Sequence, residues 1–181
     1  MPGFEADGTI DIGQIGHRSV SLSSDAGGQN RKFLVVIDDT EECDRAVTFA
    51  AHRVKRTGGT VILMAVIEPG QFQHWLGVET IMRAEALEEV EKLLDIRLRR
   101  ISEIGEVKVE TIVREGRKAE EVERLINEDR EIAILVLASG ISSEGPGPLV
   151  AAFAMRGANA LRVPVTIVPG TLSDEQIISI C

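Results

Sequence analysis

The chain has 181 residues, enough for one domain with a sizeable core, and 44% hydrophobic and 27% charged residues are typical of a globular protein. Its net charge of −9 argues against nucleic acid as the main partner, because phosphate binding needs clustered Lys and Arg. No apolar run approaches the ~20 residues of a membrane span, and no signal-peptide core opens the sequence, so we expect a cytoplasmic protein without membrane contact.

The sequence divides into three parts. Residues 1–30 hold six of the 17 glycines and little apolar periodicity, which predicts a flexible N-terminal arm whose segment Ser19–Ser24 could add to a sheet as an edge strand. Residues 31–170 form the predicted domain, and residues 171–181 are a C-terminal tail. We expect the terminal Cys181 to be mobile.

Strands and helices alternate along the domain. Apolar runs predict five strands, at 33–37, 61–67, 107–113, 132–138 and 163–168. Helical spacing of apolar residues predicts helices that begin after Thr40 and span 79–104, 117–129 and 148–161. Thr40 is the expected N-cap of the first helix, and Pro164 places the fifth strand at an edge of the sheet.

This order predicts an α/β fold: one doubly wound, open, parallel sheet of five strands with helices on both faces. Ligands of such sheets bind outside the carboxyl ends of the strands, where the strand order reverses. The first strand ends there at Asp38 and the fourth at Ala138. Asp38 and Asp39 are adjacent, so as strand residues they would point to opposite faces and would not act as a pair.

A glycine-rich loop follows the fourth strand. It contains Gly140, Gly145 and Gly147, and Pro148 opens the next helix, a residue suited to the first helical turn. Exposed N–H groups and the helix dipole can hold an anion at such a place. Cys43 falls in the first turn of the first helix, where a thiol pKa can drop, although a packing role is the interpretation we favour.

Three segments resemble the universal stress protein family. VVIDDTEECDRAV opens the domain, VREGRKAEEVERLI precedes and enters the third helix, and LRVPVTIVP closes it, in the order of the family's own motifs. The resemblance covers residues 32–170. It implies the strand order 3-2-1-4-5 and a homodimer joined through the fifth strand.

The family has an ATP-binding branch and a branch that has lost the binding motif. The motif is G-x2-G-x9-G-(S/T), and Gly147 and Gly157 match its second half. Glu144 stands where the first glycine belongs, and Ala158 replaces the hydroxyl residue, with Asn159 next in the chain as a substitute. A carboxylate at Glu144 would repel a triphosphate unless it turned away or held a metal.

The resemblance implies roles for individual residues. Asp38 would lie beside the ribose or a metal ion, although it could simply cap the turn into the first helix. Val66 would pack against adenine, although it could be ordinary core, and Gly157 would contact phosphate or allow close packing. The candidate site comprises Asp38, Val66, Gly140, Gly145, Gly147, Gly157, Ala158 and Asn159.

Three functional hypotheses follow. The first is a dimeric stress-response protein that binds ATP or a related adenine nucleotide, with or without Mg²⁺, and regulates rather than catalyses, with hydrolysis slow at most. The second is a nucleotide-free interaction protein of the same family with a degenerate phosphate loop. The third, an adenylating enzyme of similar fold, is disfavoured because Asp38-Asp39-Thr40-Glu41 stands where such enzymes carry S-G-G-x-D-S.

Overall fold

The computed structural model describes residues 17–20, 31–68, 79–141, 145–155 and 161–181. Five parallel strands make up most of one sheet, and their spatial order is β4-β3-β2-β5-β6. Counted along the chain, this is the order 3-2-1-4-5, as predicted. The strands are β2 (Lys32–Ile37), β3 (Thr60–Ile67), β4 (Lys108–Glu115), β5 (Ile132–Ser139) and β6 (Val165–Pro169).

A sixth strand comes from the N-terminal segment. Strand β1 (His17–Val20) pairs antiparallel with β4, from His17 opposite Ile112 to Val20 opposite Val109. An edge strand was expected here from Ser19 to Ser24. It lies slightly earlier in the chain, and residues 21–30 lie outside the described part.

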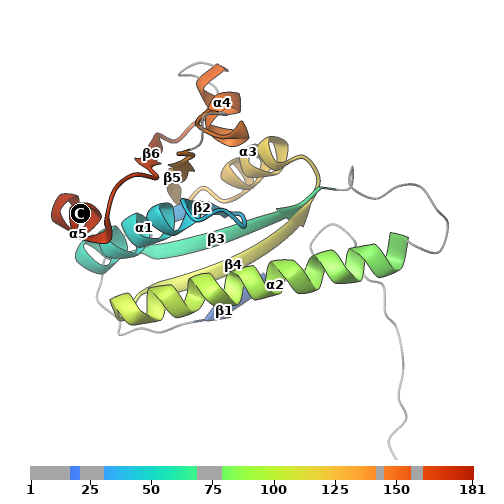
Figure 1. Cartoon of the computed structure of the whole chain (residues 1–181), viewed down its shortest axis with the longest axis horizontal. Coiled ribbons are helices and arrows are strands. Elements are labelled where there is room, and N and C mark those ends of the chain that lie inside the picture. The colour runs from blue at the N-terminus through green and yellow to red at the C-terminus, as the bar shows by residue number, and fades with distance from the viewer. Residues whose placement is uncertain (1–16, 21–30, 69–78, 142–144, 156–160) are drawn as a thin grey trace, which may run out of the picture.

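Helices cover both faces of the sheet (Figure 1). On one face, α1 (Cys43–Thr57), α2 (Glu79–Ile104) and α5 (Asp174–Ile180) share a buried apolar cluster with alternate strand residues such as Val35 and Leu63. On the other face, α3 (Lys118–Glu128) and α4 (Pro148–Met155) pack with Leu34 and Ile62. The central strands are therefore buried on both sides, which explains their continuous apolar runs.

Helix α2 extends past the carboxyl ends of β3 and β4 (Figure 1). Its carboxyl half packs on the sheet through Leu94 and Ile101, which are buried. Ile81 and Ala84, which share the predicted inward face, are exposed instead. The stretch of α2 with an apolar face is therefore longer than the stretch that packs on the sheet.

Two predicted helix boundaries need comment. Helix α1 begins at Cys43, and its N-cap position is Glu42, so the prediction that Thr40 is the N-cap is wrong. Thr40 instead donates to the side chain of Asp38 and belongs to the preceding turn. Helix α4 begins at Pro148 as expected, but the structure establishes it only to Met155, since residues 156–160 lie outside the described part.

The C-terminal tail is ordered, contrary to the expectation for Cys181. It forms α5, which opens with a capping box in which Ser173 and Gln176 satisfy each other's backbone N–H groups. Ile177 is fully buried, and Cys181 is 8% exposed. None of the described helices is long and apolar enough to cross a membrane.

Candidate functional site

Two adjoining cavities lie at the carboxyl ends of the central strands. The larger has a volume of about 200 Å³ and is lined by Ile37, Asp38, Asp39, Ala65, Val66, Ile67, Glu68, Ala86, Glu89, Val90, Leu93 and Lys118. The smaller has a volume of about 50 Å³ and is lined by Val36, Asp38, Cys43, Lys118, Leu137, Ala138, Pro146, Gly147, Pro148, Leu149 and Val150. Asp38 and Lys118 line both, so the two cavities meet between these residues.

Asp38 lies at the end of β2 and organises the turn into α1. Its Oδ1 accepts hydrogen bonds from the backbone N of Thr40 at 3.0 Å and from the Thr40 hydroxyl at 2.5 Å. The turn-capping role considered for Asp38 is therefore confirmed. Since one carboxylate oxygen is committed to the turn, the other is the oxygen that can serve a ligand.

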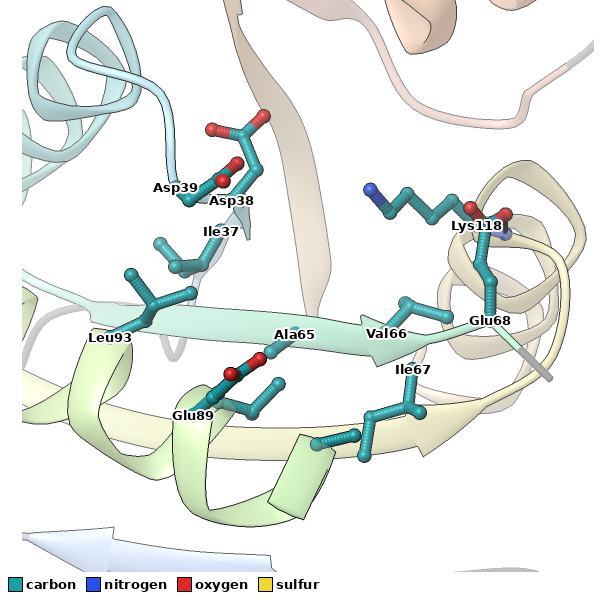
Figure 2. A pocket seen from close by; sticks show the side chains of 12 residues that line it. Ile37, Asp38, Asp39, Ala65, Val66, Ile67, Glu68, Glu89, Leu93 and Lys118 are labelled. Atoms are coloured by element: carbon teal, nitrogen blue, oxygen red, sulfur yellow. Dashed lines mark hydrogen bonds between the residues drawn. The ribbon is translucent and has the colours of Figure 1, made fainter. Parts of the chain in front are cut away.

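Asp39 corrects a prediction. Strand β2 ends at Ile37, so the alternation of a strand does not apply to Asp38 and Asp39, and both line the larger cavity. Figure 2 shows both carboxylates on the same side of that cavity. With Glu68 and Glu89 they give the larger cavity an acidic rim.

Arg97 holds the turn in place from α2. Its Nη2 donates to the backbone carbonyls of Asp38 at 3.2 Å and Thr40 at 3.1 Å, and its Nη1 lies 2.7 Å from Asp44 Oδ1. The side chain is only 8% exposed. Arg97 thus links three points of the β2–α1 segment and fixes the backbone that carries Asp38.

The glycine-rich loop combines two different uses of glycine. A Cβ at Gly140 would lie 3.0 Å from the Gly145 carbonyl oxygen, and the Gly140 N–H donates to Pro146 O, so Gly140 closes the loop. Gly145 and Gly147 have φ values of +107° and +98°, which other residues rarely adopt. Of the three, Gly147 lines a cavity, immediately before α4.

Val66 forms part of the wall of the larger cavity and is 7% exposed. Ile67 from the same strand and Val90 and Leu93 from α2 extend this wall. The cavity thus has both apolar and acidic lining residues, which suits a ligand with apolar and polar parts. Core packing and ligand contact are both consistent with the position of Val66.

Other candidates lie outside the described residues. Gly157, Ala158 and Asn159 fall in the segment 156–160, and Glu144 falls in 142–144. Their roles in a phosphate site stay predictions. In the part of the chain that the structure describes, no group of three or more His, Cys, Asp or Glu side chains is arranged to hold a metal ion.

Cys43 has a packing role. Burial raises the pKa of its thiol above the ordinary value, so the drop that the helix N-terminus suggested does not occur. The side chain is 1% exposed, and its Sγ lies 3.9 Å from Val36 O. A protonated, buried thiol is unreactive.

The sequence profile of the Universal stress protein family matches residues 29–169. No curated protein is similar enough in sequence to count as a match. Among solved structures, the universal stress protein UspA from Lactobacillus plantarum has a TM-score of 0.66 and 13% identity, over 78% of this chain and 99% of that one.

Two further similar structures are complexes with adenine nucleotides. The universal stress protein from Archaeoglobus fulgidus, in complex with dAMP, has a TM-score of 0.54 and 18% identity, over 77% of this chain and 98% of that one. A universal stress protein family protein from Arabidopsis thaliana, with AMP bound, has a TM-score of 0.54 and 19% identity, over 80% of this chain and 94% of that one. At these identities the likeness concerns the fold alone.

Proposed function

Because this chain belongs to the universal stress protein family, we propose that the two cavities at the carboxyl edge of its sheet bind an adenine nucleotide. The relatives described with dAMP and AMP support this proposal through their shared fold. The observation that carries it is the adjoining pair of cavities, which differ in character and share Asp38 and Lys118.

Each part of a nucleotide has a suitable place. The apolar wall of Val66, Val90 and Leu93 suits a planar base. The free oxygen of Asp38, at the junction, suits a ribose hydroxyl. Gly147 and the N-terminus of α4 line the smaller cavity, where backbone N–H groups and the helix dipole favour a negative group.

The finer identity of the ligand is also a proposal. ATP is the ligand of the family's nucleotide-binding branch, and Asp38 is the carboxylate that we propose for a Mg²⁺ ion that accompanies it. The role that we propose is regulatory binding in the cytoplasm, with ATP hydrolysis slow at most. Gly157, Ala158 and Asn159 are the further residues that we propose for the phosphate site.

We also propose a homodimer that forms through β6. This strand is at the edge of the sheet, and its Ile167 is 45% exposed, which supports an apolar contact there. Sedimentation equilibrium of the wild type and of Ile167→Lys tests the proposal. A wild-type monomer at micromolar concentration would contradict it.

A nucleotide-free interaction protein remains the second candidate, because one observation favours it. Asp38, Asp39, Glu68 and Glu89 surround the larger cavity, and only Lys118 among the described lining residues opposes their charge. Such a rim disfavours any anionic group inside that cavity. The nucleotide would have to place its phosphates in the smaller cavity, where Asp38 is the one carboxylate among the described lining residues.

Isothermal titration with AMP, ATP and ATP plus Mg²⁺, and with GTP as a control, decides between the two candidates. The variant Ala86→Trp fills the larger cavity from α2, and Ala84→Trp, exposed on the same helix, is the matched control. We expect adenine nucleotides to bind the wild type and Ala84→Trp, and binding to be lost in Ala86→Trp. The absence of binding to the wild type at millimolar nucleotide would refute the first candidate and leave the second.

A further inference from the structure

Lys118 has a cationic side chain that lines both cavities. It is the first residue of α3, and its backbone N–H donates to Glu68 Oε1 at 3.2 Å, which fixes the start of the helix at the end of β3. Figure 2 shows its side chain extending from α3 toward Asp38 and Asp39. Its Nζ makes no hydrogen bond or ion pair with any residue that the structure describes.

Lys118 lies among acidic side chains at the place where the two cavities meet. It is half-buried and is the one basic side chain among the described residues that line the two cavities. The carboxylates around it come from the β2–α1 turn (Asp38, Asp39), the end of β3 (Glu68) and α2 (Glu89). All four carboxylates border the larger cavity, whereas only Asp38 among them also borders the smaller one, which Lys118 lines together with Gly147 and Pro148.

We propose that Lys118 Nζ binds the phosphate attached directly to the ribose, so that the site selects a nucleotide over the corresponding nucleoside. This inference rests on the proposed function. A base against Val66 and a ribose beside Asp38 leave the first phosphate at the junction of the cavities, where Lys118 lies. The smaller cavity, at about 50 Å³, receives this phosphate between the ammonium group and the start of α4.

The proposal separates the first phosphate from the others. Loss of a contact with the first phosphate should lower the affinities for AMP and ATP by the same factor. The affinity for adenosine, which has no phosphate, should not change. A hydrogen bond to a charged group corresponds to a change in affinity of roughly 10- to 100-fold. We therefore expect Lys118→Met to lower the affinity for AMP and ATP by that amount and to bind adenosine like the wild type.

The test is isothermal titration of AMP, ATP and adenosine into the full chain and its variants. Lys92→Met is the matched control, because Lys92 is a 67% exposed lysine paired with Glu88 on the outer side of α2 and its removal changes the net charge equally. Lys118→Arg, which keeps the charge, should recover most of the AMP affinity. Circular dichroism and thermal unfolding confirm that each variant is folded.

The outcomes are distinct. An equal loss for adenosine and AMP would overturn the inference, because Lys118 would then support the base or the cleft as a whole. A loss for ATP without a loss for AMP would also overturn it, since the contact would be with a distal phosphate. If the wild type binds neither AMP nor adenosine, the proposed function itself fails.

Discussion

Arg97→Met should destabilise the protein through the turn that carries Asp38. Methionine keeps much of the apolar stem of Arg97 and removes the guanidinium group. The carbonyls of Asp38 and Thr40 then lose their donor, and Asp44 loses its buried cation. The variant therefore isolates the polar contacts of one buried side chain.

The size of the effect follows from the exposure of the partners. Breaking a fully buried ion pair costs about 3–5 kcal/mol. Asp44 is 29% exposed, so water replaces part of the lost interaction, and the lower end of that range applies. A loss of about 3 kcal/mol would lower the melting temperature of a protein of this size by roughly 6–12 °C. It is also a large share of the ~5–15 kcal/mol by which domains are stable.

Urea unfolding followed by circular dichroism measures the effect. Arg99→Met, an exposed arginine two residues along α2, is the control and should change the free energy of unfolding by less than about 0.5 kcal/mol. A double-mutant cycle with Asp44→Asn apportions the Asp44 contribution. If Arg97→Met unfolds within about 0.5 kcal/mol of the wild type, then Arg97 does not hold the turn.

Two further predictions concern the α1 face of the sheet. Ile177→Ala should lower the free energy of unfolding by about 2–5 kcal/mol, because Ile177 is fully buried under α5, whereas Ile178→Ala, at a 47% exposed position, should have little effect; equal effects in urea would show that α5 is not packed. The second prediction uses Cys181→Ser, which leaves Cys43 as the one thiol. Burial raises the pKa of the Cys43 thiol in the folded protein, so this thiol ionises first in the unfolded chain, and the free energy of unfolding should fall as the pH rises above about 9.0. Rapid alkylation of the folded protein at pH 8 would contradict the raised pKa.

The sheet could be predicted from sequence because its signals are local. The runs that became β2, β3 and β5 are continuous and apolar, and burial on both faces requires such runs. The length of the inward face of α2 could not be predicted. Periodicity shows which residues share a face, but not where the sheet beneath that face ends, and Ile81 lies beyond it.

The starts of α5 and α1 differ in how well the sequence predicts them. Ser173 and Gln176 have the spacing of a capping box, so α5 could have been recognised in the tail. At α1, both Asp38 and Thr40 are residues that favour turns and helix starts. The sequence could not tell that Asp38 would bond to Thr40 and delay the helix to Cys43.

The candidate site was only partly predictable. Asp38 and Gly147 were identified from their places at a strand end and before a helix, and Val66 from the family resemblance, and all three line the cavities. Arg97 and Lys118 were missed, because each looks like an ordinary charged helix residue. Their places in the site depend on segments far away in the chain, as in the contact of Arg97 with Asp38, 59 positions earlier.

The four-residue strand β1 covers part of the edge of the sheet that β4 would otherwise leave open. Without it, the four residues of β4 from Val109 to Ile112 would have free N–H and C=O groups that could pair with the same strand of another molecule. Val109 and Ile112, at the two ends of this paired stretch, are apolar. Removal of the first 30 residues would therefore give the sheet a second free edge, besides that of β6, at which molecules can aggregate edge to edge.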